Sequence, residues 1–326
     1  MKSMRLMTSL LALFLVLIIA EPTYARPERP ATLRVGMIPI AAVLPLFTAL
    51  EKGFFEEEGI KVEAIPMAGG AVILPAMAGG SIDIGFTAIP SVIMARDSGF
   101  DFQIITHNNN NNTIPARNRF GYRGSEAILV PKGSKIATAK DLEGKRVAVN
   151  TLNNIAWLMG HAWMEKNGAD PNKVTWVEVD FPKMEAALLS GQVDAIHATE
   201  PFTSLMISKG GVEVIDFHFS SVRPHVAIAS YVASSAWIKK NPDLVERFVK
   251  AHTKGIEYVN RHPEERVPIL TRYTKLSPEL IKRMVHYRYE SKIDMKELRW
   301  WAEIIYKKGL TRRIIDPEEI VYKTAR

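Results

Sequence analysis

Glycines and short polar residues follow three predicted strands, at the points where helices should begin. These segments are Gly69-Gly70-Ala71, Thr87-Ala88 and the run from Asn150 to Asn154. A helix start offers unpaired backbone N–H groups and a positive dipole end, and glycine lets a ligand approach the backbone closely. Three such starts facing one crevice could hold a small oxyanion without a lysine. Threonine and asparagine also cap helices where no ligand binds, so each residue has that structural reading as well.

A second kind of candidate is the carboxylate of Glu200, which precedes Pro201 at the end of another predicted strand. It could act as a base, accept a hydrogen bond from a ligand amine, or bond to neighbouring backbone, and we favour the last two roles. Aromatic residues near the same loops could wall an organic ligand, although a single aromatic is more often part of the core. They are Phe47, Phe86, Trp157 and Phe202.

Three arginines and a histidine form a weaker set of candidates. Arg119 and Arg123 flank a short Phe-Gly-Tyr segment, and Arg223 and His225 lie near residues 222–226, where the chain is expected to cross between two lobes. A bidentate Arg suits a sulfonate or a carboxylate. The alternative is that these residues belong to a solvated surface segment.

Signals for catalysis or a metal are weak. No nucleophile elbow with a Ser/His/Asp order appears, no His-x-x-x-His pair appears, and the histidines are scattered. The absence of Cys removes thiolate metal sites, a Cys nucleophile, disulfides and lipid attachment through an N-terminal Cys. We therefore expect a binding protein without cofactor or metal, rather than an enzyme.

The elements that position these residues occur twice in the sequence. Gly80-Ser81-Ile82-Asp83 and Gly191-Gln192-Val193-Asp194 are each followed, after six further residues, by proline, at a constant offset of 111. A helix, a glycine stop, a short apolar strand and a turn are thus used in both places. Two copies indicate two similar lobes, and a cleft between lobes is a common place for a small ligand.

The N-terminus has the pattern of an export signal. A basic start precedes an apolar run over residues 6–20, and residues 23–25 offer a small-residue cleavage site. The run is short for a membrane-spanning helix. We expect residues 1–25 to be a signal peptide cleaved near Ala25 and the protein to be periplasmic. The net charge of +7 is spread along the chain, which is typical of a solvated surface, and export makes nucleic acid an unexpected partner.

Strand and helix patterns alternate along most of the chain, which predicts an α/β fold with parallel pairing. We expect a two-lobed clamp, each lobe a mixed, mostly parallel sheet with helices, followed by a helical C-terminal extension. Lobe 1 would comprise residues 31–132 and 224–326, and lobe 2, inserted in it, residues 133–223. The chain would cross between them near 131–134 and 222–226, so the lobes could close around a ligand as on a hinge.

Two further regions carry predictions of their own. The five Asn residues at 108–112 indicate a mobile surface loop. Beyond Asn241 the pattern is helical, with Asn-Pro and Ser-Pro starts. The expected helices are 242–261, 263–272, 277–288, 294–308 and a last one over 317–324.

Four motifs give the chain a family resemblance. They are the segment 51–63, Ala78-Gly79-Gly80-Ser81-Ile82-Asp83-Ile84-Gly85, the segment 141–149, and Glu200-Pro201-Phe202. Across about residues 31–255 the chain resembles the periplasmic substrate-binding proteins of ABC importers, in the aliphatic sulfonate, nitrate and taurine group. The resemblance implies a type II-like binding-protein clamp. Such a clamp would deliver a small molecule, here expected to be an anion, to an inner-membrane ABC permease, and would work as a monomer.

The resemblance also implies which positions face the ligand. Together with the helix starts, the expected ligand-binding set is Ile40, Ala41, Ala42, Gly69, Gly70, Ala71, Thr87, Ala88, Asn150, Thr151, Asn153, Asn154, Thr199, Glu200 and Phe202, with Arg119, Arg123, Arg223 and His225 as weaker members. Thr199 stands where family members often carry Trp, and the Asn run is atypical. Both features distinguish this chain from the usual members of the group.

Other functions are compatible with the same sequence features. A relative of this fold is an enzyme that makes the thiamine pyrimidine, but that group carries a Cys-rich motif and this chain has no Cys. A receptor or sensor that binds ligand without transport would share the same cleft. So would a protein that binds a pyrimidine-type heterocycle.

Overall fold

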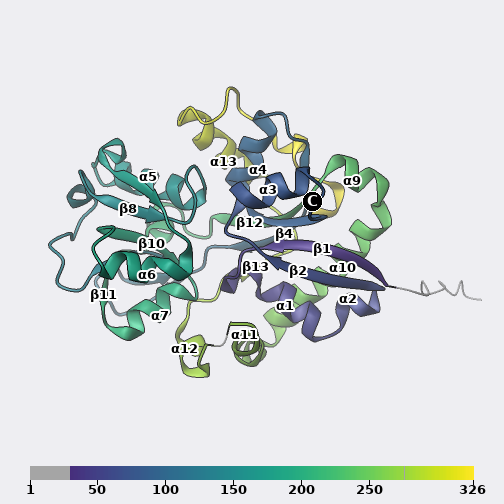
Figure 1. Cartoon of the computed structure of the whole chain (residues 1–326), viewed down its shortest axis with the longest axis horizontal. Helices are drawn as coiled ribbons and strands as arrows, with labels where there is room; N and C mark the ends of the chain where they lie inside the picture. Colours follow the sequence, from purple (N-terminus) through teal and green to yellow (C-terminus); the bar gives the residue numbers. More distant parts are fainter. Residues whose placement is uncertain (1–29, 275) are drawn as a thin grey trace, which may run out of the picture.

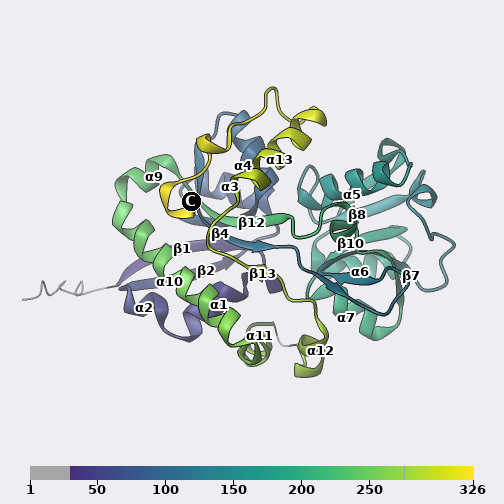
Figure 2. The same cartoon turned by 180° about the vertical axis from the view of Figure 1, so that it is seen from behind.

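Two separate β-sheets divide the molecule into two lobes (Figure 1). The computed structural model describes residues 30–274 and 276–326, so the signal peptide expected at 1–25 lies outside the described residues. The two lobes lie side by side when seen from either face, each with helices packed around its sheet (Figure 2). The predicted two-lobed α/β clamp is confirmed.

The first lobe is built on a six-stranded sheet. From edge to edge its strands are β13 (Arg288–Tyr289), β4 (Phe102–Asn110), β12 (Ala227–Ser234), β3 (Ile84–Ala88), β1 (Ala31–Met37) and β2 (Ile60–Pro66). β1 pairs in parallel with β2 and β3, whereas β12 runs antiparallel between β3 and β4. β12 thus belongs to the first lobe, in agreement with the range 224–326 predicted for the return of the chain.

The second lobe is built on a five-stranded sheet. Its strands are β11 (Val212–Asp216), β7 (Glu126–Pro131), β10 (Ala195–Thr199), β8 (Arg146–Val149) and β9 (Thr175–Glu178). β8 pairs in parallel with β9 and β10, and β7 is antiparallel to β10 and β11.

One strand lies in a different lobe from the one expected. We placed residues 126–131 in the first lobe, and that is wrong for β7, because its backbone is bonded between β10 and β11 of the second sheet. The chain therefore changes sheets between Asn110 and Glu126. It does so through a small hairpin made of β5 (Thr113–Pro115) and β6 (Tyr122–Gly124).

The sequence repeat corresponds to the same structural unit in both lobes. Before β3, the Asp83 carboxylate accepts hydrogen bonds from the Arg34 backbone N–H (2.9 Å) and guanidinium (2.7 and 3.1 Å). Before β10, the Asp194 carboxylate accepts from the Arg146 backbone N–H (2.8 Å) and guanidinium (3.1 and 3.2 Å). The glycine that opens each motif has a φ of 74°, the left-handed conformation that ends the preceding helix. Each Arg–Asp pair fixes a repeat strand to its parallel neighbour.

Helices cover both sheets. Those of the first lobe and the C-terminal region are α1 (Leu44–Glu51), α2 (Phe54–Glu57), α3 (Gly70–Ala78), α4 (Ile89–Asp97), α9 (Ser235–Lys240), α10 (Pro242–Arg261), α11 (Arg266–Thr274), α12 (Pro278–Arg283) and α13 (Met295–Lys307). Those of the second lobe are α5 (Ile155–Lys166), α6 (Phe181–Leu189), α7 (Phe202–Lys209) and α8 (His218–Val222). Among the residues that the structure describes, no helix is long and apolar enough to cross a membrane.

The core of the first lobe lies between its sheet and helices α1, α2, α10 and α13. Phe55, Phe248 and Trp301 are fully buried there. Fully burying a side chain such as Phe stabilises a fold by about 1.5–3 kcal/mol. Helix α10 packs so closely on α1 that a Cβ at Gly255 would collide with the Pro45 carbonyl oxygen.

The C-terminal helices agree with the prediction over α10, α11 and α13, with a 3-10 turn at Pro263–Glu265 before α11, and differ elsewhere. The helix expected over 277–288 ends at Arg283, because Met284 is extended and Val285 donates its N–H to Glu200 of the second lobe (3.2 Å). In place of the helix expected over 317–324, the structure has two short 3-10 turns, Pro317–Glu319 and Lys323–Ala325, with Val321 between them bridged to β4.

The first four residues of the Asn run at 108–112 are buried and the last is half-buried, so the predicted mobile surface loop is wrong. Its first three residues end β4. The Asn108 amide donates to the Ala42 carbonyl (2.9 Å), and the Asn111 amide donates to Ser220 of the second lobe (3.1 Å). Polar side chains that satisfy one another can occupy the interior. The run therefore joins the two lobes instead of extending into solvent.

A C-terminal segment also connects the lobes. The Tyr287 hydroxyl donates to Glu126 of the second lobe (2.7 Å), and the Tyr289 hydroxyl donates to the Ala41 carbonyl of the first (3.0 Å). This segment is a third link between the lobes, beside the two chain crossings.

Candidate functional site

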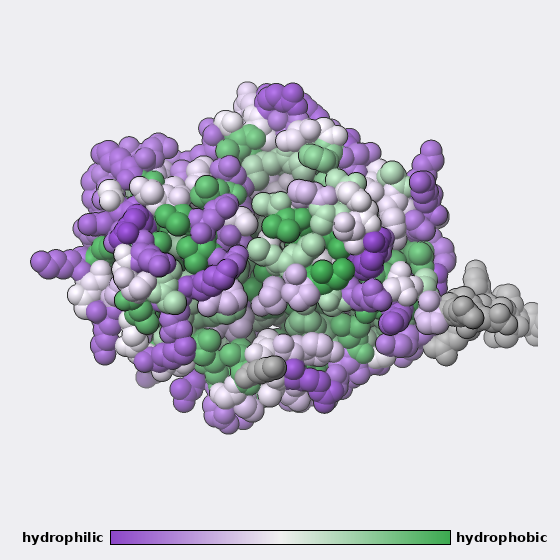
Figure 3. All heavy atoms as spheres, viewed as in Figure 1, coloured by the Kyte–Doolittle hydropathy of each residue, from purple (hydrophilic) through white to green (hydrophobic). Residues whose placement is uncertain are grey.

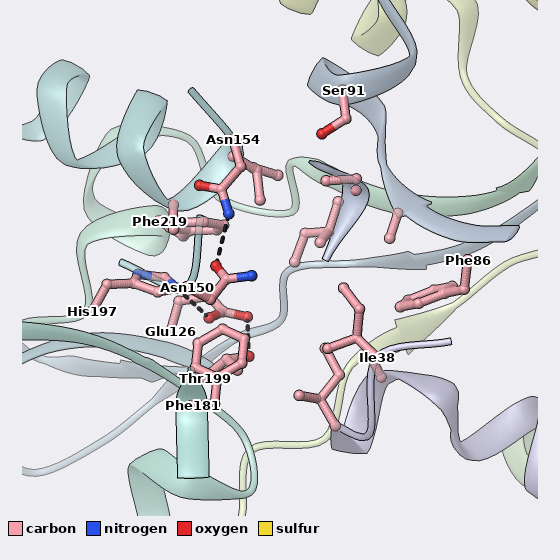
Figure 4. Close-up of a pocket in the computed structure, with 18 of the residues that line it drawn as sticks. Ile38, Phe86, Ser91, Glu126, Asn150, Asn154, Phe181, His197, Thr199 and Phe219 are labelled. Atoms are coloured by element: carbon pink, nitrogen blue, oxygen red, sulfur yellow. Dashed lines mark hydrogen bonds and ion pairs between the residues drawn. The ribbon is translucent and has the colours of Figure 1, made fainter. Parts of the chain in front are cut away.

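A cavity lies between the two lobes, and residues from both line it (Figure 4). Its volume is about 50 Å³, and it adjoins two wider openings of about 310 and 230 Å³. Gly70 and Asn154 belong to both the cavity and the first opening, whereas Ile40 and Phe181 belong to both the cavity and the second. On the face shown in Figure 3, apolar residues gather over this zone between the lobes.

The two copies of the repeat contribute residues to the cavity at matched positions. The first member of each pair follows β1 or lies in β3, and the second follows β8 or lies in β10. The pairs are Ile38 with Asn150, Phe86 with His197, and Ala88 with Thr199. Figure 4 shows the labelled members on opposite sides of the gap. At these matched positions the first lobe presents apolar side chains and the second presents hydrogen-bonding groups.

A buried carboxylate is the centre of the polar side. Glu126, at the start of β7, is 3 % exposed. Its Oε1 accepts from the Tyr287 hydroxyl (2.7 Å) and the Thr199 hydroxyl (2.9 Å). Its Oε2 has no hydrogen-bond partner among the described residues and lies 3.4 Å from His197 Nε2. One oxygen of this carboxylate is therefore satisfied and the other is not.

Two histidines behind Glu126 fix the direction of the donors. His197 Nδ1 lies 3.0 Å from His218 Nε2, and His218 Nδ1 has no partner among the described residues. Burial, reinforced by the neighbouring His197, lowers the pKa of His218 well below its usual range, so His218 is neutral. Its one N–H is best placed on Nε2, donating to His197. His197 then carries its own proton on Nε2, which lies 3.4 Å from Glu126 Oε2 without making a hydrogen bond to it.

Aromatic rings complete the second lobe's side of the cavity. Phe181, at the start of α6, and Phe219, in α8, flank His197 with ring centroids at 6.2 and 5.5 Å. The carboxylate therefore lies in surroundings of low polarity, where electrostatic interactions are stronger than in water.

The cavity offers negative charge at this end. The lining residues, among those described, include Glu126 but no Lys or Arg. Two like charges about 4 Å apart repel by ~4 kcal/mol at an effective dielectric constant of 20. A helix start stabilises an exposed anion by ~0.3–1 kcal/mol and a partly buried one by up to ~2 kcal/mol. One helix start therefore does not offset this repulsion for an oxyanion beside Glu126, and a ligand there gains most by donating a hydrogen bond.

The three helix starts singled out in the sequence meet at the cavity. They contribute Gly70 of α3, Ala88 before α4 and Asn154 before α5. Glycine is required at position 70, because a Cβ there would lie 2.6 Å from the Thr87 hydroxyl oxygen and 2.8 Å from that of Ser91.

The asparagines at these starts are already engaged. Asn154 Oδ1 accepts the Trp157 backbone N–H (3.1 Å), which caps α5, and its Nδ2 donates to Asn150 Oδ1 (2.7 Å). Asn150 Nδ2 in turn donates to the Ala68 carbonyl of the first lobe (3.3 Å). These amides cap a helix and bridge the lobes.

The expected ligand-binding set divides into three groups by position. Lining the inner cavity are Ile40, Ala42, Gly70, Ala88, Asn150, Asn154 and Thr199. Lining its openings are Ala71, Thr151, Asn153 and Phe202. Lining neither are Ala41, Gly69, Thr87 and Glu200.

Glu200 takes the backbone-bonding role that was one of its favoured alternatives. Its carboxylate accepts from the Ser204 backbone N–H (3.1 Å), the Ser204 hydroxyl (2.8 Å) and the Val285 backbone N–H (3.2 Å). Burial raises the pKa of Glu200 to about 7, although these three donors oppose the shift. The carboxylate therefore connects α7 to the C-terminal segment.

The weaker candidates are engaged away from the cavity. Arg119 donates to the carbonyl groups of Val214 and Ile215, and Arg223 pairs with Glu297. Arg123 lines a separate pocket beside α7 and α12, and His225 Nδ1 lies 3.4 Å from the Asn111 carbonyl oxygen. None of the four lines the cavity or its two openings.

Several lining residues escaped the sequence-based selection. Phe86 had been noted only as an aromatic near the loops, while Glu126, His197, Phe219 and Tyr287 were not selected. The repeat offset could have found His197, because it matches Phe86 at a distance of 111 residues. No sequence signal marked Glu126 or Tyr287, which lie 161 residues apart and meet only through the fold.

Within residues 30–274 and 276–326, no group of three or more His, Asp or Glu side chains could hold a metal ion. The candidate site is a small cavity between two lobes, with one mainly apolar side and one polar side.

Comparison with known proteins agrees with this architecture. An aliphatic sulfonates-binding protein of Bacillus subtilis (strain 168), provisionally so named, is 24 % identical over 245 residues, covering 74 % of this chain and 70 % of the relative. A 4-amino-5-hydroxymethyl-2-methylpyrimidine phosphate synthase of Saccharomyces cerevisiae is 20 % identical over 259 residues, covering 76 % and 71 %. The relatives thus include both a binding protein and an enzyme.

A solved structure gives the same fold. The alkanesulfonate-binding protein from Xanthomonas axonopodis pv. citri, bound to MOPS, superposes with a TM-score of 0.72 at 20 % identity, covering 90 % of this chain and 99 % of the other. The model of the NMT1/THI5-like family matches residues 41–266. These residues include most of both sheets and both copies of the repeat, and the chain belongs to the NMT1/THI5-like family.

Proposed function

We propose that this chain is the solute-binding component of an ABC importer. It captures a small molecule between its lobes and delivers it to a permease in the inner membrane. The observation that carries the proposal is the cavity whose matched linings come from equivalent strands of the two lobes. Binding-protein relatives with the same fold support it.

The class of solute is a separate matter from capture itself. Relatives named for sulfonates and the three helix starts favour a sulfonate-, nitrate- or taurine-like anion. The Glu126 carboxylate disfavours one, because no Lys or Arg among the described lining residues balances it. The proposal of capture and delivery holds for either class.

We also propose that the chain binds without catalysing a reaction. One relative is named as a synthase, which makes an enzyme the alternative. This chain has no Cys, and the residues that line its cavity favour hydrogen bonding to a ligand. The expected result is that a bound solute is released chemically unchanged. Mass spectrometry of the solute before and after incubation checks this.

Export and oligomeric state belong to the same proposal. We propose cleavage near Ala25, a periplasmic location and a monomer. N-terminal sequencing of the secreted chain checks the first two, and light scattering checks the third. A chain that keeps residues 1–25 in the mature protein would contradict the proposed processing.

Lobe motion supplies the direct test of capture. The chain has no Cys, so two introduced thiols are the sole labelling positions. Val72→Cys and Leu189→Cys place spin labels on exposed residues of opposite lobes. We expect a solute that raises the melting temperature to narrow the distribution of distances between the labels. Labels at Val72→Cys and Ile314→Cys, both in the first lobe, are the control and should report no change.

Solutes for that test come from a thermal-shift screen of residues 26–326, unfolded and refolded to remove bound molecules. A ligand at 100 times its dissociation constant stabilises by about 2.7 kcal/mol, which a melting curve resolves. If stabilising solutes leave the distance between the lobes unchanged, the clamp mechanism is wrong.

A further inference from the structure

The carboxylate of Glu126 has no matching charge of opposite sign. Its only ion-pair contact among the described residues is with His197, whose Nε2 lies 3.4 Å from Oε2. A buried carboxylate without a good partner is costly, and folded proteins normally satisfy such groups. Oε2 is left without a hydrogen bond in a residue that lines the cavity.

The arrangement around Glu126 holds Oε2 in place as an acceptor. Tyr287 and Thr199 both bond to Oε1, so the carboxylate cannot rotate without losing those two hydrogen bonds. His197 is oriented by His218 and lies beside the same oxygen. A fixed, unsatisfied acceptor on a residue that lines a cavity selects for a donor on the ligand.

The opposite side of the cavity is mainly apolar, and Ser91 of α4 is the polar side chain that the first lobe contributes to it. Ile38 and Phe86 of the first lobe face the gap, Ala88 also lines the cavity, and none of the three offers a side-chain hydrogen bond. The volume of about 50 Å³ is small, so the group next to Glu126 must be compact. A ligand that fits both sides is polar at one end and apolar at the other.

We propose that the solute carries a compact N–H donor of the amine or amidine class on an apolar body, and that Glu126 Oε2 accepts its hydrogen bond. The inference rests on the proposed function and names the solute class of the same cavity. It excludes nitrate and simple sulfonates as the preferred solutes, because they bring a second negative charge to the carboxylate.

The test uses the refolded chain 26–326 and two series of probes in calorimetry. The donor series is butylamine, benzylamine and benzamidine. The oxyanion series is nitrate, ethanesulfonate and benzenesulfonate. Each probe is titrated into the wild-type protein and the Glu126→Gln variant, which replaces Oε2 or Oε1 by an amide donor of nearly the same shape. Asp216→Asn is the control, because this carboxylate of the second sheet is bonded to Tyr122 and Trp163 and does not line the cavity.

We expect at least one amine or amidine to bind the wild-type protein, with affinity 10- to 100-fold lower in Glu126→Gln and unchanged within twofold in Asp216→Asn. Oxyanions should bind the wild-type protein more weakly than the donor probe does. Their affinity should fall less than that of the donor probe, or rise, in Glu126→Gln.

Three outcomes would overturn the inference. If an oxyanion binds tightly and no donor probe does, the solute class is wrong while solute capture stands. If a donor probe binds equally well to Glu126→Gln, Glu126 is not its acceptor. If no probe binds, the donor class is rejected. Native mass spectrometry of the chain purified from its own periplasm then decides the proposed function, since a retained solute of any class would keep it.

Discussion

The two copies of the repeat use one scaffold for opposite purposes. Both fix a parallel strand pair with an Arg–Asp interaction, and both end the preceding helix with a glycine at the same φ of 74°. Their cavity-lining positions differ at each matched pair: Ile38, Phe86 and Ala88 in one copy are Asn150, His197 and Thr199 in the other. The first copy supplies a surface of fixed shape, and the second supplies directed hydrogen bonds.

This difference shows which positions of the unit carry the fold and which carry recognition. The Arg–Asp pair and the glycine are the same in both copies because each satisfies backbone geometry that either lobe needs. The alternate residues of β3 and β10 that face the cavity are free of that demand. A ligand held between the lobes would thus be gripped by shape on one side and by polarity on the other.

The largest expected effect concerns Glu200, whose matched position in the first copy is the apolar Ile89. Burial raises the pKa of Glu200 to about 7 from 4.5. The folded state therefore binds more protons than the unfolded state between these values, and stability falls as pH rises through that window. We expect Glu200→Gln to remove this loss, so that the variant gains about 3 kcal/mol over wild type between pH 4.5 and pH 7.

Chemical denaturation at several pH values measures the effect. The buried histidines with lowered pKa values, such as His107 and His252, make both proteins less stable as pH falls below about 6.5, and that contribution cancels in the difference. If the free energies of unfolding of wild type and Glu200→Gln change with pH in parallel, Glu200 has the same pKa in the folded and unfolded states and the prediction is wrong.

The second prediction compares the two Arg–Asp pairs directly. The Asp83 side chain is 13 % exposed and that of Asp194 is 30 % exposed. Hydrogen bonds to charged groups contribute about 1.5–3 kcal/mol, and solvent weakens the more exposed pair. We expect Asp83→Ala to lower the free energy of unfolding by about 2–3 kcal/mol and Asp194→Ala by about 1–2 kcal/mol, in urea titrations.

High salt provides the control, because it should reduce the effect of Asp194→Ala more than that of Asp83→Ala. If Asp194→Ala lowers the free energy of unfolding more than Asp83→Ala does, the stabilisation by the Arg–Asp pair does not follow its burial.

The third prediction converts one polar position to the character of its apolar partner. Asn150 donates to the Ala68 carbonyl across the cleft (3.3 Å), whereas its counterpart Ile38 makes no such bond. Asn150→Ala should weaken solute binding by about 1 kcal/mol, or roughly fivefold, and broaden the inter-lobe distance in the spin-label measurement. Ile38→Ala should reduce affinity without broadening that distance. Equal broadening in both variants would remove the special role of the amide.

Much of the fold was accessible from the sequence because it is written in local patterns. The repeat, the glycine stops and the Asn-Pro start of α10 predicted two α/β lobes and a helix at 242–261, which the structure has. The failures came where long-range contacts decide. The Asn run reads as polar surface, but its partners are Ala42 and Ser220, far away in sequence, and they make it interior.

The site shows the same limit. Helix starts brought Gly70, Ala88 and Asn154 to the cavity, because they lie at the ends of predictable strands. Glu126 fell within the range 31–132 predicted for the first lobe, and its partner Tyr287 fell within the helix predicted over 277–288. Neither position carries a local motif. Their chemistry arises from tertiary packing that places a carboxylate beside a hydroxyl.

The smallest expected effect concerns Thr87, which the sequence suggested as a ligand contact and whose matched position in the second copy is Ala198. Its hydroxyl is fully buried, has no hydrogen-bond partner among the described residues, and does not line the cavity. A buried hydroxyl without a partner is unfavourable. We expect Thr87→Val to raise the free energy of unfolding by about 0.5 kcal/mol and to leave solute affinity unchanged within twofold.

Thr106→Val is the matched control, because that hydroxyl is also buried but bonds to the carbonyl groups of His107 and Ser291. It should lose about 1 kcal/mol, opposite in sign to Thr87→Val. A tenfold loss of solute affinity in Thr87→Val would restore Thr87 to the binding site. The first copy would then supply a hydrogen bond as well as shape, and the contrast between the two copies would be one of degree.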